Sequence, residues 1–340
     1  MLPTAEQVNN ARELLLRFLK PTRLVQAERI GTDSNTRIFL KLETELPTKS
    51  FKPRGALYAL MTTLGQRSSK GGKGGLGVKG VKGVKGVVAS STGNHGAAVA
   101  YAARVAQLPA TIFLPQFPNP FKRARIVSLG AHVIEVESGA SLAEAADAYA
   151  KEHDYYFLDD SSSDLVPVGT ATIAAEIFDE LPGPDVLIVP MGDTALIRGV
   201  ATEAKRRHPG IRIVGVQAEQ APSYVCSWRE GRVITTEKCD TIADGLATCV
   251  PTESNVREIR ELVDEVCLVS EDELLRCVRS LLLEERLVAE AAGAAATAAY
   301  LQNPANYSGR TVVLLVTGAN LPDELLLRAM AERVNQDSSG

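Results

Sequence analysis

The chain has 340 residues, 45% of them hydrophobic and 23% charged, and its 37 basic and 41 acidic side chains give a net charge of −4. That length suffices for one large or two ordinary globular domains, and the slight acidic excess disfavours nucleic acid or an anionic membrane as the main partner. No apolar run approaches the roughly 20 residues of a membrane span, and polar residues interrupt the amphipathic N-terminus, so we expect no signal peptide.

Short β-branched runs alternate with longer helical patterns along almost the whole chain. We expect strands at residues 37–42, 86–90, 111–114, 132–136, 185–190, 211–217 and 311–316. We expect helices at about 52–65, 94–107, 119–129, 140–152, 170–181, 194–207, 272–287, 290–302 and 321–334. This alternation predicts an α/β fold of mostly parallel, twisted sheets with helices on both faces. Ligands of such sheets bind at the carboxyl ends of strands, beside helix N-termini.

Lys52 stands where the first of these strands has ended and a helix begins, in the sequence Ser-Phe-Lys-Pro-Arg-Gly-Ala at 50–56. A solvated lysine needs no such tight corner. A lysine that must hold one fixed position does, so we take Lys52 as a candidate site residue.

The next segment, residues 68–86, interrupts the alternation. It is rich in glycine and repeats lysine five times. This composition predicts a flexible loop rather than packed structure. A basic anion-binding patch is the alternative.

The strand at 86–90 is followed by Ser91-Thr92-Gly93-Asn94-His95-Gly96 and then by a helix. Small residues let the backbone approach a ligand closely, and the N–H groups at a helix start can face an anion such as a carboxylate. The amide of Asn94 can donate to a further oxygen. Taken alone, the pattern is equally typical of a structural turn.

Two later strands end in comparable loops. The strand at 185–190 leads into Met191-Gly192-Asp193-Thr194-Ala195, whose backbone could hold a phosphate, although a carboxylate at Asp193 would repel it. The strand at 311–316 leads into Thr317-Gly318-Ala319-Asn320, which would place a hydroxyl at the same edge. A helix N-cap explains that last turn equally well.

Together, a fixed lysine, a loop suited to a carboxylate, a loop suited to a phosphate and a lone hydroxyl indicate a phosphorylated carbonyl cofactor. Lysine forms Schiff bases with carbonyl compounds, and pyridoxal 5'-phosphate is the common case.

The cysteines do not add a site. There are five, all in the C-terminal half and with no Cys-x-x-Cys pair: Cys226, Cys239, Cys249, Cys267 and Cys277. The odd count and the spacing are not typical of a disulfide framework or a zinc site. We expect buried free thiols and a cytoplasmic, reducing location.

Over roughly residues 20–335 the sequence resembles the fold type II pyridoxal-phosphate enzymes, of the tryptophan synthase beta-like fold, and within them the serine/threonine dehydratases. The resemblance rests on motifs in family order: P-T-R-L at 21–24, S-F-K-P-R-G-A at 50–56, S-S-T-G-N-H-G at 90–96, T-I-A-D-G-L-A at 241–247, E-A-A-G-A at 290–294 and T-G-A-N at 317–320.

The resemblance implies roles for these positions. Lys52 would carry the cofactor as a Schiff base and then act as a base, with Thr92 as a second catalytic group. The cofactor would be held by Phe51, Lys52, Asn94, Gly192, Asp193, Thr194, Ala195, Leu196, Gly245, Glu290 and Thr317. The substrate would be held by Ser91, Thr92, Gly93, Asn94 and His95.

The implied reaction is an α,β-elimination on a small β-hydroxy amino acid, such as threonine or serine. The cofactor delocalises the carbanion, a β-hydroxyl leaves, and hydrolysis yields a 2-keto acid and ammonia. The hydroxyl of Thr317 need not keep the pyridine nitrogen protonated, which suits elimination better than transamination. A racemase, a β-replacement enzyme such as a cysteine or threonine synthase, and a non-catalytic relative remain as alternatives.

Three departures from the family pattern bear on these alternatives. The phosphate loop reads Gly-Asp-Thr-Ala at 192–195, where the family usually has four glycines, which puts cofactor affinity in question. Thr92 stands where racemases often have a serine, which favours the dehydratase. Gln217 and Ser223 stand where metal-activated relatives carry acids, so we expect no metal site.

The resemblance also implies an architecture. We expect a smaller, mobile α/β domain at 54–155 and a larger cofactor-binding domain formed by 1–53 and 156–340, with the cofactor between them. A homodimer is expected as well.

Overall fold

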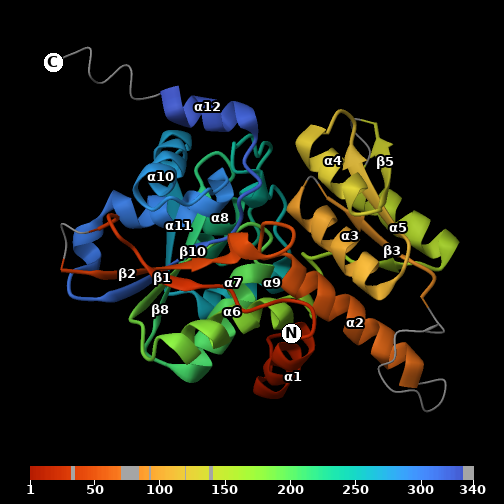
Figure 1. Cartoon of the computed structure of the whole chain (residues 1–340), viewed down its shortest axis with the longest axis horizontal. Coiled ribbons are helices and arrows are strands. Elements are labelled where there is room, and N and C mark those ends of the chain that lie inside the picture. Colours follow the sequence, from red (N-terminus) through yellow and green to blue (C-terminus); the bar gives the residue numbers. More distant parts are fainter. Residues whose placement is uncertain (32–34, 70–83, 92, 119, 138–140, 332–340) are drawn as a thin grey trace.

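A computed structural model describes residues 1–31, 35–69, 84–91, 93–118, 120–137 and 141–331 (Figure 1). Its strands are β1 (Leu24–Gln26), β2 (Arg37–Leu42), β3 (Val87–Ser90), β4 (Ala110–Pro115), β5 (His132–Val136), β6 (Tyr156–Phe157), β7 (Val186–Pro190), β8 (Arg212–Ala218), β9 (Glu265–Val269) and β10 (Thr311–Val316).

The strands are connected mainly by helices, most of which lie in the predicted intervals, whereas α1, α8 and α9 were not predicted. These are α1 (Ala5–Leu15), α2 (Pro53–Ser69), α3 (Asn94–Ala106), α4 (Pro120–Ser128), α5 (Leu142–His153), α6 (Val166–Glu180), α7 (Ala195–Arg207), α8 (Ser223–Glu230), α9 (Glu253–Leu262), α10 (Glu271–Glu284), α11 (Ala291–Gln302) and α12 (Asp323–Ala331). Short 3-10 turns are η1 (Glu43–Glu45), η2 (Asp244–Leu246) and η3 (Pro304–Tyr307).

The strands form two sheets. The larger has the order β1-β2-β10-β7-β8-β9 and the smaller has the order β5-β4-β3-β6. Every pairing is parallel except that of β1 with β2. The prediction of mostly parallel sheets in an α/β fold is therefore confirmed.

Helices cover both faces of the larger sheet because its central strands are apolar on both sides. In β10, Val312, Leu314 and Val316 pack into a core shared with α10 and α11. The alternate residues, Val313 and Leu315, pack into a second core shared with α6 and α7. The two-residue period of a strand thus divides one apolar run between two helical layers.

The smaller sheet is built in the same way. Ile112 and Leu114 of β4 face a core that includes residues of α2 and α3, whereas Phe113 faces α5. Figure 1 shows this sheet with α3, α4 and α5 as a group beside the larger sheet, linked to it by α2. The division into two domains stays a prediction. One detail differs from it: β6, which pairs with β3, lies just past the expected boundary at residue 155.

The missed strands have weak sequence signals. β1 and β6 have three and two residues, so neither produces an alternating pattern long enough to recognise. The strand β9 pairs with β8 at the edge of its sheet, where side chains are only partly buried. By contrast α10 begins at a clear signal, since Ser270 and Glu273 form a capping box.

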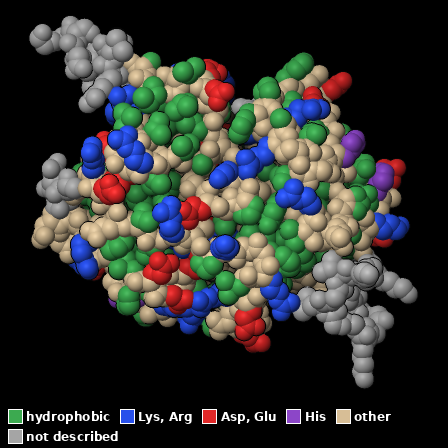
Figure 2. Space-filling model, viewed as in Figure 1, with side chains coloured by type: hydrophobic (Ala, Val, Ile, Leu, Met, Phe, Trp, Pro, Cys, Tyr) green, Lys and Arg blue, Asp and Glu red, His purple; other side chains and the backbone are tan. Residues whose placement is uncertain are grey.

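The surface and the remaining segments complete the fold. Acidic, basic and apolar side chains intermingle on the face shown in Figure 2. Within the described part of the chain, no helix combines the length and the apolar character needed to cross a bilayer. The predicted loop at 68–86 lies mostly outside the described residues, although α2 extends to Ser69.

Candidate active site

A cavity opens where the carboxyl ends of strands from both sheets meet the start of α2. It is lined by Phe51, Lys52, Ser90, Ser91, Gly93, Asn94, His95, Asp160, Pro190, Gly192, Asp193, Leu196, Asp244, Gly245, Leu246, Ala247, Thr248, Glu290, Ala292 and Thr317. Most of the predicted site residues are among these. Thr194 and Ala195 lie beside the cavity without lining it, and Thr92 lies outside the described residues.

Lys52 is placed by backbone contacts on both sides of it. The N–H of Phe51 donates to the carbonyl of Thr317 at 3.0 Å, and Ser50 forms a β-bridge with Gly318. The carbonyl of Lys52 accepts from the N–H of Ala56 in the first turn of α2. The lysine is therefore held between the turn after β10 and the helix start.

The side chain of Lys52 is 11% exposed and lies between two carboxylates. Its Nζ is 2.5 Å from Oδ2 of Asp160 and 2.6 Å from Oδ2 of Asp193. Burial alone would lower the pKa of Lys52, but the two carboxylates outweigh burial and raise it. The lysine is thus fixed as an ammonium in this arrangement.

The two carboxylates are not equivalent. Burial raises the pKa of Asp160, and the nearby Asp193 carboxylate raises it further. Burial acts on Asp193 in the same direction, but Lys52 and hydrogen bonds outweigh it and hold the pKa of Asp193 well below its usual range. Asp160 is therefore the carboxylate of the pair that binds a proton first.

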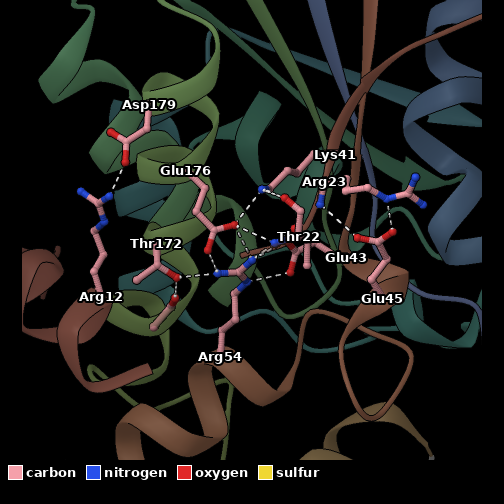
Figure 3. Close-up of polar contacts among 11 residues, drawn as sticks. Arg12, Thr22, Arg23, Lys41, Glu43, Glu45, Arg54, Thr172, Glu176 and Asp179 are labelled. Atoms are coloured by element: carbon pink, nitrogen blue, oxygen red, sulfur yellow. Dashed lines mark hydrogen bonds and ion pairs between the residues drawn. The ribbon is translucent and has the colours of Figure 1, made fainter. Parts of the chain in front are cut away.

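A second charge cluster anchors the start of α2 two residues after Lys52 (Figure 3). Arg54 is 2% exposed. Its guanidinium binds Glu43 and Glu176 through two hydrogen bonds each, at 2.6–2.9 Å, and also donates to Thr172 and Thr22. Because a planar guanidinium matches a carboxylate in this bidentate way, the cluster fixes the orientation of the helix that follows Lys52.

Asn94 and Glu290 meet on another wall of the cavity. Nδ2 of Asn94 donates to Oε1 of Glu290 at 2.6 Å, and Oδ1 of Asn94 accepts from Asn320 at 2.6 Å. Burial raises the pKa of Glu290, and Lys122 opposes this effect. The hydroxyl of Thr317 donates to the carbonyl of Ala292 at 3.4 Å.

The loop after β3 is closed by Ser91. Its Oγ accepts from the N–H groups of Gly93 and Gly96, at 3.0 and 2.9 Å. With both lone pairs engaged, this hydroxyl can form a further hydrogen bond only as a donor. His95 is buried, with Nε2 at 2.8 Å from the carbonyl of Leu158 and Nδ1 at 3.3 Å from Asp160.

Two glycines allow separate segments to approach closely. A Cβ atom at Gly192 would collide with the carbonyl oxygen of Gly245, and one at Gly318 would collide with the carboxylate of Glu290. These positions cannot carry a side chain without movement of the backbone or of Glu290. They bring the loop after β7, the turn η2 and the start of α11 to one cavity.

Sequence reasoning missed Asp160 and the pair formed by Lys122 and Asp244. Asp160 follows β6, whose two residues were not recognised as a strand, so its strand-end position was hidden. Lys122 of α4 is buried and binds Asp244 of η2. Residues from distant segments meet here, and no spacing in the sequence indicates that contact.

The expectation of five free thiols is wrong for two of them. Cys239 and Cys249 form a disulfide, with Cα atoms 5.7 Å apart. The bond closes a loop whose residues 244–248 line the cavity. The spacing of ten residues between Cys239 and Cys249 does not indicate a disulfide in the sequence, because only the folded loop brings the two cysteines together. Cys226, Cys267 and Cys277 are free.

Comparison with known proteins agrees with this geometry. A family model described as pyridoxal-phosphate dependent enzyme matches residues 15–318. The L-threonine ammonia-lyase of Thermotoga maritima is 32% identical over 326 residues, which cover 96% of this chain and 77% of the relative. The catabolic L-threonine dehydratase TdcB of Staphylococcus aureus is 31% identical, with 92% and 88% covered.

Solved structures show the same architecture. A threonine deaminase from the organism abbreviated T.th. superposes with a TM-score of 0.82 at 29% identity, covering 94% of this chain and 99% of that one. Maize serine racemase superposes with a TM-score of 0.87 at 24% identity, covering 99% and 100%, a likeness that speaks for the fold alone. From the family match over most of its length, this chain belongs to the pyridoxal-phosphate dependent enzymes.

Proposed function

We propose that this protein is a pyridoxal-phosphate dependent ammonia-lyase that converts a small β-hydroxy amino acid, such as threonine or serine, to a 2-keto acid and ammonia. The observation that carries the proposal is the largely buried Lys52, directly before α2, in one cavity with Asn94, Glu290, Gly192 and Thr317. Relatives named as threonine ammonia-lyase or dehydratase, at 31–32% identity, support the same choice.

The residues present fit the cofactor at most points. Thr194 Oγ1 and Glu290 Oε2 are buried polar atoms without a hydrogen-bond partner among the described residues, and buried polar atoms of this kind normally have one. The backbone at Gly192 leaves no room for a side chain, and α7 begins three residues later. The misfit is the carboxylate of Asp193, which lies in the loop that would hold the phosphate.

When bound, the cofactor would supply an electron sink for the carbanion formed at Cα of the substrate. Lys52 would attach the cofactor, and Asn94 would donate the second N–H of its amide to the ring hydroxyl. Thr317 would face the ring nitrogen. The hydroxyl of Ser91 would donate to the substrate carboxylate.

Lys52 must lose a proton before it can act as a nucleophile or as a base. Asp160 is a suitable acceptor because its Oδ2 lies 2.5 Å from Nζ and its pKa is raised by burial and by Asp193. Nδ1 of His95 faces the same oxygen at 3.3 Å. We assign the departing proton of Lys52 to Asp160.

The test is release of keto acid and ammonia from a panel of β-hydroxy amino acids, by the protein purified with pyridoxal phosphate. Lys52→Ala is the inactive comparison, and Lys49→Ala, at an exposed neighbouring lysine, is the matched control. Release by wild type and Lys49→Ala alone supports the proposal. A cofactor absorbance band without product would favour racemase or β-replacement chemistry, and neither band nor product would favour a non-catalytic relative.

We also propose a homodimer in the cytoplasm. Sedimentation velocity tests the first part, and a single species at the mass of one chain would contradict it. Cell fractionation tests the second part. Its outcome matters because a disulfide such as Cys239–Cys249 is uncommon in a reducing compartment.

A further inference from the structure

The carboxylate of Asp193 binds two groups with which the cofactor would interact, an amine and a backbone N–H. Its Oδ2 lies 2.6 Å from Nζ of Lys52, and its Oδ1 accepts from the N–H of Ala195, the first residue of α7, at 2.9 Å. One carboxylate thus engages both the reactive amine and the start of the helix. The loop that connects β7 to α7 already contains its own anion.

The start of α7 is where a phosphate would be expected to bind. Exposed N–H groups and the positive end of the helix dipole favour an anion there. Thr194 is 1% exposed, and its buried hydroxyl has no hydrogen-bond partner in the part of the chain that the structure describes. A phosphate at this point would compete with Asp193 for the N–H of Ala195 and would lie beside a like charge.

We propose that Asp193 is an internal competitor of the cofactor phosphate, which weakens cofactor binding and makes it depend on proton uptake. The inference rests on the proposed function for the identity of the cofactor. It goes further in assigning to one side chain a control over how readily the phosphate enters.

The direction of the pH effect follows from the groups that face Asp193. These are Lys52 from the start of α2 and Asp160 from the loop after β6, and the amide of Asn255 in α9 approaches the backbone carbonyl of Asp193. Lys52 keeps the pKa of Asp193 low. The charge of an incoming phosphate raises that pKa while Lys52 stays an ammonium, so phosphate binding takes up a proton at Asp193 and tightens as the pH falls.

The experiment measures binding of three probes to wild type, Asp193→Asn and Asp193→Gly by calorimetry between pH 6 and 8.5. The probes are inorganic phosphate, pyridoxal phosphate and pyridoxal, which lacks the phosphate. Asparagine keeps an acceptor for the N–H of Ala195 but removes the charge, whereas glycine removes both. We expect phosphate affinity to rise in the order wild type, Asp193→Asn, Asp193→Gly, by about tenfold or more overall.

Asp160→Asn is the matched control, because Asp160 contacts the same Lys52 amine but not the N–H of Ala195. It should change phosphate affinity much less than Asp193→Gly does. Proton uptake, measured in buffers of different ionisation enthalpy, should be smaller in Asp193→Asn than in wild type. Circular dichroism would show that each variant is folded.

Unchanged or weaker phosphate binding in both Asp193 variants would overturn the proposal, and so would an equal gain in Asp160→Asn. Failure of the proposed function looks different. In that case the Asp193 variants bind inorganic phosphate more tightly, but neither they nor wild type bind pyridoxal phosphate better than phosphate itself.

Discussion

Lys52 and Arg54 are two residues apart, yet they lie in charge clusters of different kinds. Arg54 and Lys41 balance Glu43 and Glu176 in a cluster in which no side chain is more than 13% exposed. Lys52 faces two carboxylates, Asp160 and Asp193, in an open cavity. A balanced, buried cluster resists any change of protonation, whereas a cluster with one excess acid can take up or release a proton.

The difference suggests a division of labour. The cluster at Arg54 fixes the first turn of α2. Because Lys52 directly precedes this turn, its side chain has a defined place in the cavity. A functional group is more accurately positioned when it is carried by a rigid element. The comparison predicts that changes at Lys52 affect activity, whereas changes at Arg54 affect stability.

The largest effect is expected at Lys52. Lys52→Ala should lower keto-acid release by at least about 10³-fold, as is common when a covalent or acid–base group is removed. The fold should persist, since the two carboxylates left behind can bind a proton. Steady-state kinetics with threonine and serine check this, and an active Lys52→Ala would contradict the assigned role.

Arg54→Met should lower the stability of the fold, in contrast to Lys52→Ala, which should lower activity. Removing one partner of a buried ion pair leaves uncompensated charge and costs about 3–5 kcal/mol of unfolding free energy. Urea unfolding measures this value. Arg23→Ala is the control, because Arg23 pairs with Glu45 at the exposed edge of the same region (Figure 3) and should cost within about 1 kcal/mol. Equal losses would show that the Arg54 cluster is not special.

The third prediction concerns the Cys239–Cys249 disulfide, which closes a loop that lines the cavity and has no counterpart in the Arg54 cluster. Cys239→Ser should lower the unfolding free energy by about 2–3 kcal/mol, the value for a loop of this length. A reductant should bring wild type down to the same value. Cys226→Ser, at a free thiol, is the control. Wild type that is insensitive to reductant would contradict the contribution of this bond.

The smallest effect is a pH dependence of stability. The pKa of Lys52 is raised in the folded chain, so its contribution is complete below the unfolded pKa of about 10.4 and is lost as the pH rises toward the folded value. The pKa of Asp193 is lowered, so its contribution is present above about pH 3.9 and is lost at lower pH.

Urea unfolding of wild type and Lys52→Met from pH 7 to 11 measures the alkaline part. The stability advantage of wild type should be greatest near neutral pH and should shrink above pH 10. An advantage that grows in that range would argue against the ion pairs at Lys52. The stability advantage of wild type over Arg54→Met should not shrink in this pH range, because a guanidinium does not lose its proton there.

The sequence by itself determined the alternation of strands and helices, and with it the parallel sheets. Local periodicity carries this information, since β-branched runs such as 311–316 and capped helices such as α10 are recognisable without their neighbours. The motif around Lys52 and the loop at 91–96 were visible for the same reason, because each is continuous in the chain.

Only the tertiary structure decided how charges are paired. Asp160 reaches Lys52 across more than a hundred residues, Glu176 reaches Arg54 over a similar distance, and Asp193 turns toward the lysine rather than into solvent. The two cysteines that join at the edge of the cavity are likewise brought together by the folded loop. Such contacts depend on where distant segments meet in space, and Coulomb forces act over that distance whatever the spacing along the chain.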